Sequence, residues 1–215
     1  IYCGASGYFR GFDTSLMDSS LEKTTNQIEI LPYINQHLWK GMPVLKVKNK
    51  VSDKDGENLL FCANISSNRH EGEKGIGGMI KLMEIAVKAM SPGINDPGTA
   101  IDAITKLGRL LRKFLKFSSI TSEQINGGDI ILVRNNIRAE ELMRIIVQPI
   151  RLYAKNDILV LYELISALQY IEKTSGISED NRKVIQEELK SFRRDIKKHI
   201  DNESDREQIL GLLND

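Results

Sequence analysis

Residues 90–100 read MSPGINDPGTA and place two prolines and two glycines between two apolar segments. A proline just past a helix end cannot continue the helix, so the first segment is expected to end near Ser91. Asp96 followed by Pro97 is typical of an N-cap and the first helical residue after it. The stretch therefore predicts a rigid corner between two helices, at 79–90 and 97–116.

Helical periodicity continues on both sides of this corner. In 79–90 the polar residues Lys81, Glu84 and Lys88 lie on one stripe, which is typical of a helix central to a core. The apolar face of the second helix consists of Ile101, Ile104, Leu107, Leu111 and Phe114. The later pattern predicts a turn at 126–128, a short strand at 130–133, and helices at 139–154, 158–174 after an Asn156 cap, 179–200 after a Ser178 cap, and 203–213.

The first third of the chain has a different pattern. Short strands are predicted at 8–12, 27–31 and 44–47, with one helix at 14–24 capped by Asp13 and another at 52–66. The fold class is therefore expected to be α+β and mostly α, with a small β-rich N-terminal unit followed by a helical bundle. The expected division is a β-rich unit with one or two helices at 1–66, a glycine-rich connection at 67–78, and a helical domain with one short strand at 79–215.

The composition is that of a globular protein. The 215 residues are 41% hydrophobic and 27% charged with a net charge of +1, which excludes disorder and disfavours a nucleic-acid partner. Two cysteines, Cys3 and Cys62, cannot build a disulfide scaffold and indicate a reducing compartment. No apolar run approaches the roughly 20 residues of a membrane helix. Because the chain opens with Ile1, we expect it to be a piece of a longer protein.

The corner is also the strongest candidate for a ligand site. The first N–H groups of a helix have no partner within the helix, so those of Gly98 and Thr99 would attract an anion. Asn95 and the Thr99 hydroxyl could add polar contacts, and Arg69 could add charge if the glycine-rich segment folds back. The alternative is that Asn95 and Asp96 only cap the helix.

Arg151 is the sixth candidate ligand residue, at a second corner that reads RLYAKND over 151–157. One interpretation is a buried ion pair with Asp157 that locks this corner. The other is an arginine that reaches a ligand near the first corner. The predicted ligand-binding residues are Asn95, Asp96, Gly98, Thr99, Arg69 and Arg151.

No other motif carries recognisable chemistry. His37, His70 and His199 lack metal-ligand spacing, and no nucleophile motif is present, so neither catalytic nor metal residues are nominated and no cofactor is named. The 179–200 helix has an apolar seam that could pack within the chain or against a neighbouring subunit. Its other side is basic and carries Lys190, Arg193, Arg194, Lys197 and Lys198. This side could be a solvated face, or it could contact anionic headgroups of a membrane.

The segment 81–100 resembles a known bacterial family of predicted multi-pass membrane proteins, domain of unknown function 2254. The resemblance rests mainly on the run SPGINDPGTA at 91–100, with weaker matches at Gly7-Tyr8, Asp13, 41–44, Arg69 and 150–153. Together these matches reach to about Leu168. His37, Lys74 and Lys81 depart from the family pattern.

The resemblance implies the soluble C-terminal region of a membrane protein, with transmembrane helices before Ile1. The implied location is the bacterial inner membrane, with this region on the cytoplasmic side. The expected partners are the protein's own transmembrane region, further copies of the chain in a homo-oligomer, and a small anionic ligand. The family offers no reaction and no cofactor.

Three functions remain open. The first is a ligand-responsive regulatory or assembly module that binds a small anion. The second is an enzyme acting on a phosphate-containing small molecule, with Asn95, Asp96 and Thr99 converging on Arg69 and Arg151. The third is a purely structural oligomerisation domain. The absence of a recognisable catalytic set in the sequence favours a binding role over catalysis.

Overall fold

The computed structural model describes residues 1–22, 24–68, 75–117, 120–124 and 129–213. Contacts divide the chain into two units, each built from two segments of sequence. Unit 1 comprises Ile1–Gly72 and Ser118–Ile137, and unit 2 comprises Glu73–Phe117 and Arg138–Asp215. The fold is α+β and mostly α, with all the described strands in unit 1, which confirms the predicted class.

A three-stranded antiparallel sheet of unit 1 has the order β3-β1-β5, from His37–Leu38, Gly7–Phe12 and Ala63–Ser66. Helix α2, Asp53–Cys62, precedes β5 and begins at an N-cap, Ser52, whose hydroxyl accepts from the Asp55 N–H. The predicted helix at 52–66 is therefore wrong at its C-terminal end. Its last residues pair with β1 instead, Ala63 opposite Phe12 and Ile65 opposite Phe9, and this distant pairing outweighs local helical preference.

The second sheet has the order β4-β2-β7-β6, from Leu45–Val47, Asn26–Ile30, Ile130–Asn135 and Ile120–Gln124. Strands β2 and β7 are parallel, with Ile28 opposite Leu132. The strand predicted at 130–133 belongs to unit 1 and not to the helical domain expected at 79–215. The physical reason is burial, since Ile130 and Leu132 lie in the same hydrophobic core as Ile28 and Ile30.

The segment after β1 is also more broken than predicted. Asp13 does act as an N-cap, accepting from the Ser15 N–H at 2.9 Å, but it begins a 3₁₀ turn at Thr14–Leu16. Met17 then adopts an extended backbone and buries its side chain, before the short helix α1 at Ser19–Glu22. A continuous helix at 14–24 is therefore not formed.

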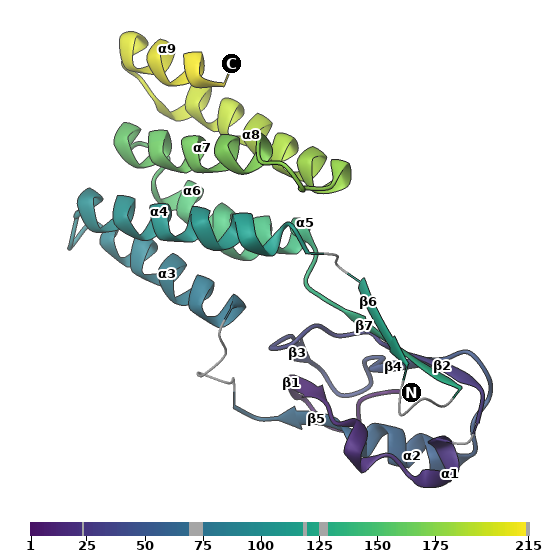
Figure 1. The fold of residues 1–215 in the computed structure, drawn as a ribbon. Helices are drawn as coiled ribbons and strands as arrows, with labels where there is room; N and C mark the ends of the chain where they lie inside the picture. The colour runs from purple at the N-terminus through teal and green to yellow at the C-terminus, as the bar shows by residue number, and fades with distance from the viewer. Residues whose placement is uncertain (23, 69–74, 118–119, 125–128, 214–215) are drawn as a thin grey trace. The chain divides into compact units, whose positions relative to one another are not determined.

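All the regular elements in the described residues of unit 2 are helical (Figure 1). Its elements are α3 (Ile76–Ala89), α4 (Pro97–Phe114), α5 (Ala139–Leu142), a π-helical turn (Met143–Val147), α6 (Gln148–Tyr153), α7 (Ile158–Glu172), α8 (Glu179–His199) and α9 (Glu203–Leu212). The predicted 139–154 helix thus contains a π turn. The cap of α7 is Asp157 rather than Asn156, because the Asp157 carboxylate accepts from the Val160 N–H at 3.0 Å.

Helix α4 lies between α3 and α7 (Figure 1). Of its predicted apolar face, Ile104, Leu107 and Leu111 are buried, while the two end residues are only partly covered. The prediction that the preceding helix is central to the core is wrong. Helix α3 packs through Met79, Ile80, Ala86 and Ala89, but Ile85 on its other side is 46% exposed. The central positions belong instead to α4 and α7.

No helix in the described parts of the chain is both long and apolar enough to cross a bilayer.

Candidate functional site

The corner between α3 and α4 is held by backbone hydrogen bonds. The Asn95 N–H donates to the Ser91 carbonyl at 2.9 Å, and the Asp96 N–H donates to the Ala89 carbonyl at 2.9 Å. Asn95 has φ of 46°, a left-handed conformation that asparagine tolerates better than most residues. The expected rigid corner is therefore present, and it fixes where α4 begins.

The amide groups at the start of α4 face the side chain of Asp96. Its carboxylate accepts from the Thr99 N–H at 3.0 Å and from the Thr99 hydroxyl at 2.5 Å. These two bonds, first the hydroxyl and then the N–H, lower the pKa of Asp96, and the Gly98 N–H contributes in the same direction. Asp96 therefore carries its negative charge at neutral pH and acts as the helix cap.

This geometry bears directly on the predicted anion site. Asn95, Asp96, Gly98 and Thr99 all lie at the exposed surface, but the Thr99 N–H is already occupied by the carboxylate of Asp96. An incoming anion would be repelled by that carboxylate or would have to displace it. Arg69, expected to supply charge here, lies outside the described residues.

Arg151 is buried and bound to two acidic residues of α8. Its Nε donates to Glu188 at 2.8 Å, one of its terminal nitrogens donates to Asp195, and its guanidinium lies 5.6 Å from the centroid of the Phe192 ring. The predicted ion pair with Asp157 is wrong, because Asp157 caps α7. Glu188 and Asp195 are seven residues apart, which places both on one face of α8. This spacing is the feature of the sequence that could have indicated a shared partner such as Arg151.

Arg151 lines a pocket of about 310 Å³ between the α5–α6 region and α8. The pocket contains charges of both signs, with Glu140, Glu187, Arg144 and Arg194 among its other lining residues. None of residues 95–99 lines it. Arg151 therefore links α6 to α8, and the structure does not bring it together with residues 95–99 in one pocket.

A larger pocket, of about 520 Å³, lies where the C-terminal parts of α7 and α9 meet α8. Four cationic side chains, one carboxylate, two amides and two leucines line it: Lys173, Arg182, Lys190, Arg193, Glu172, Gln169, Gln186, Leu189 and Leu213. Sequence reasoning did not nominate this site. Only the basic side of the 179–200 helix, which includes Lys190 and Arg193, pointed to this region.

Two of these cations are positioned by helix ends. Arg182 donates to the carbonyl of Glu172 and, at 2.8 Å, to that of Thr174, both at the end of α7. Arg193 donates to the Leu213 carbonyl at 2.5 Å, just past the end of α9. Cations are stabilised at helix C-termini, where carbonyl groups lack partners within the helix.

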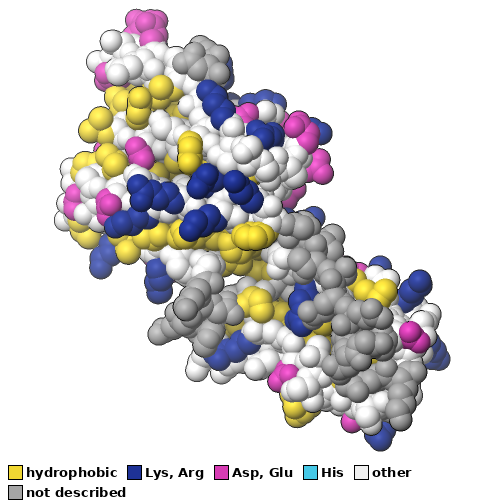
Figure 2. All heavy atoms as spheres, in the orientation of Figure 1, with side chains coloured by type: hydrophobic (Ala, Val, Ile, Leu, Met, Phe, Trp, Pro, Cys, Tyr) yellow, Lys and Arg dark blue, Asp and Glu magenta, His cyan; other side chains and the backbone are white. Residues whose placement is uncertain are grey.

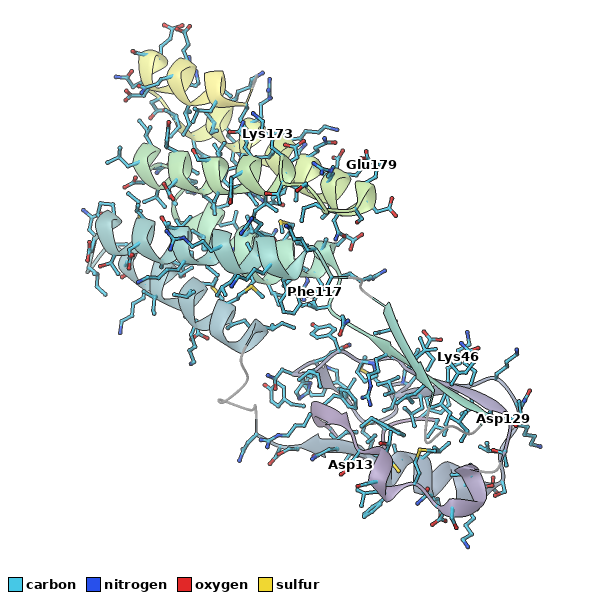
Figure 3. The ribbon with its side chains drawn as sticks, in the orientation of Figure 1. Asp13, Lys46, Phe117, Asp129, Lys173 and Glu179 are labelled. Atoms are coloured by element: carbon cyan, nitrogen blue, oxygen red, sulfur yellow. The ribbon has the colours of Figure 1, made fainter. Side chains whose placement is uncertain are left out.

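Two further contacts shape the same pocket. Glu172, the carboxylate in the lining, accepts from the Gln186 amide at 2.7 Å. Lys190 forms an exposed pair with Glu187 at 2.6 Å, whereas Lys173 extends from the end of α7 (Figure 3). The pocket therefore combines a positive charge with a partly apolar wall.

The described residues contain no metal-binding cluster, and neither thiol is exposed. Among them, no three His, Cys, Asp or Glu side chains lie close enough together to hold a metal ion. Cys3 and Cys62 are free and buried, and burial raises the pKa of Cys62 and so disfavours its thiolate. His37 makes edge contacts with the rings of Tyr8 and Trp39. His70 lies outside the described residues.

Comparison with known proteins found one family and nothing further. No curated protein and no solved structure matches the chain. A family model described as "Predicted membrane protein (DUF2254)" matches residues 1–170, which include the corner at 91–100. Most of the lining of the larger pocket lies beyond the matched region. Because the match covers well over half of its length, the chain belongs to this family of predicted membrane proteins, domain of unknown function 2254.

Proposed function

We propose that this chain is a regulatory module of a membrane protein and that it binds a small anion in the pocket between α7, α8 and α9. The observation that carries the proposal is the lining of that pocket, in which four cationic side chains meet one carboxylate around a volume of about 520 Å³. That volume is in the range of small-molecule sites.

The way Arg182 is held supports an anionic ligand. Arg182 donates to carbonyl oxygens rather than to carboxylates, so its charge is oriented but not neutralised by an ion pair. Lys173 likewise has no carboxylate partner among the described residues. Guanidinium and ammonium groups arranged in this way suit a phosphate or carboxylate, and Leu189 and Leu213 could contact an attached apolar group.

The corner at 95–99 is a weaker place for the same ligand. The carboxylate of Asp96 already occupies the Thr99 N–H, so the helix end has an internal anion of its own. The enzymatic alternative loses support as well, because Arg151 is bound to Glu188 and Asp195. We therefore place the ligand in the pocket and give the corner the role of orienting α4.

Isothermal titration with inorganic pyrophosphate tests this proposal. In the Lys173→Gln, Lys190→Gln double variant we expect affinity to fall about fivefold or more for each lost charged contact. The matched control is the Lys183→Gln, Lys197→Gln double variant, which removes the same charge from exposed positions of α8 outside the pocket. Equal losses in both double variants, or no binding of pyrophosphate to the unaltered chain at millimolar concentration, would contradict the proposal.

The two free cysteines support a cytoplasmic location for this module in a bacterial inner-membrane protein. Cys3 and Cys62 are both unpaired, which is typical of a reducing compartment. The Lys198→Cys variant, altered at an exposed position, should then react with a membrane-impermeant maleimide in inverted membrane vesicles but not in intact cells. The reverse pattern would place the module on the other side.

Assembly with a second copy is the other candidate function, and exposed apolar side chains favour it. Leu152 and Tyr153 at the end of α6 are 51% and 57% exposed, and Leu159 and Tyr162 at the start of α7 are 65% and 45% exposed. Neighbouring exposed apolar residues of this size are typical of interfaces. Sedimentation equilibrium should show an oligomer that the Leu159→Lys, Tyr162→Lys variant dissociates, whereas a monomer at all concentrations would exclude this role.

A further inference from the structure

A row of cations occupies the outer face of α4. Lys106, Arg109, Lys113 and Lys116 follow one another at spacings of three, four and three residues, so they share one face of the helix and its C-terminal extension. All four are exposed. Figure 2 shows Lys and Arg side chains gathered over α4.

Little negative charge opposes this row. Asp102, one turn before Lys106, pairs with it at 2.5 Å. Arg109, Lys113 and Lys116 have no carboxylate partner among the described residues. The unpaired charge is therefore concentrated on about two turns of helix.

Helix α8, whose basic side could also contact anionic headgroups, differs from α4 because more acidic residues lie among its cations. Lys190 pairs with Glu187 at 2.6 Å, and Lys183 lies 4.0 Å from Asp180. Acidic and basic residues are thus interleaved along α8, and its field is weaker than that of α4.

Aromatic side chains flank the row on α4. Phe117 lies just past the end of α4 (Figure 3). Its exposed fraction is 73%. Tyr170 of the neighbouring helix α7 is 55% exposed, and the guanidinium of Arg112 lies over its ring at 5.5 Å from the centroid. Exposed aromatic rings beside cations are typical of protein surfaces at the boundary between membrane and water.

We propose that this face of α4, with Phe117, binds the anionic phospholipid headgroups of a bilayer. The bilayer is the occupant that fits, because the chain belongs to a family of predicted membrane proteins and because cations without acidic partners complement anionic headgroups. None of these residues lines the pocket of the proposed function, so the two proposals stand or fall separately.

Co-sedimentation of the 215-residue chain with lipid vesicles tests the proposal. Vesicles of phosphatidylglycerol and phosphatidylcholine should bind the chain, vesicles of phosphatidylcholine alone should bind it weakly, and salt should weaken the binding. The Arg109→Gln, Lys113→Gln, Lys116→Gln variant should lose about a hundredfold in affinity for the anionic vesicles. Circular dichroism would verify that each variant is folded.

A matched control separates this face from general electrostatic attraction. The Lys183→Gln, Lys197→Gln, Lys198→Gln variant removes the same charge from exposed positions of α8 and should keep most of the affinity. An equal loss in the two triple variants would overturn the proposal. So would equal binding to neutral and anionic vesicles, or complete competition by millimolar glycerol phosphate, which would assign the face to a soluble phosphate compound.

The aromatic contribution has its own control. Phe117→Ala should weaken vesicle binding several-fold, whereas Phe61→Ala, which removes a ring that is 70% exposed in unit 1, should leave it unchanged. Equal behaviour of the two variants would remove Phe117 from the docking face.

Discussion

At the scale of single residues, the carboxylate of Asp96 stabilises α4 by capping its N-terminus. Its carboxylate accepts two bonds from Thr99, which lower its pKa below the ordinary value of 3.8. A depressed folded-state pKa contributes stability that is present above the unfolded value and lost as the pH falls through the folded one. We expect Asp96→Ala to lower the melting temperature by a few degrees at neutral pH. Thermal scans should show this difference shrinking below pH 3.8, and a difference independent of pH would contradict the ionised cap.

The loss of Arg151 should destabilise unit 2 strongly. It is 8% exposed and holds Glu188 and Asp195, so Arg151→Ala would leave two carboxylates without their cation. Breaking a buried pair in this way costs about 3 kcal/mol or more. Arg144→Ala, which disturbs an exposed pair with Glu141, should cost under about 1 kcal/mol. Urea denaturation measures both, and similar losses would argue against a structural role for Arg151.

At the scale of elements, the closeness of α4 and α7 depends on Gly108. A Cβ at this position would lie 3.1 Å from the Cβ of Ala167, tighter than ordinary contact, whereas a Cβ at Gly78 in α3 would meet nothing within 4 Å. Alanine is favoured over glycine in helices by up to about 1 kcal/mol. We therefore expect Gly78→Ala to raise the free energy of unfolding of unit 2. Gly108→Ala should give a free energy of unfolding about 1 kcal/mol lower than that of Gly78→Ala, because crowding against Ala167 offsets the gain. Equal free energies of unfolding would show that the two helices have room to separate.

At the scale of the whole molecule, strand β7 pairs with β2, which lies about a hundred residues earlier in the chain. Leu132→Ala should destabilise unit 1 by about 2–5 kcal/mol, because Leu132 is fully buried in its core. Cys62 lies in the same core, so its rate of reaction with a thiol reagent should rise in this variant. Leu142→Ala, an equally buried change in unit 2, should leave that rate unchanged, and an increase there would contradict the division into units.

The sequence by itself determined the features that depend on neighbouring residues. Local backbone preferences and helical periodicity predict the corner at 91–100 and the N-caps Asp13, Asp96 and Ser178, and the structure has them. They also predict the middle of the buried face of α4, at Ile104, Leu107 and Leu111. The family resemblance, carried by one short run of residues, was also confirmed.

Only the tertiary structure decided the pairings between distant segments. The strand at Ala63–Ser66 was predicted as helix, and β7 was assigned to the wrong unit, because a strand's partner is set by burial against residues far away in sequence. The partners of Arg151 on α8, and the carbonyl groups that hold Arg182 and Arg193, are likewise visible only once the helices are packed. Charged side chains select among several possible partners, and packing alone determines which of them lies within reach.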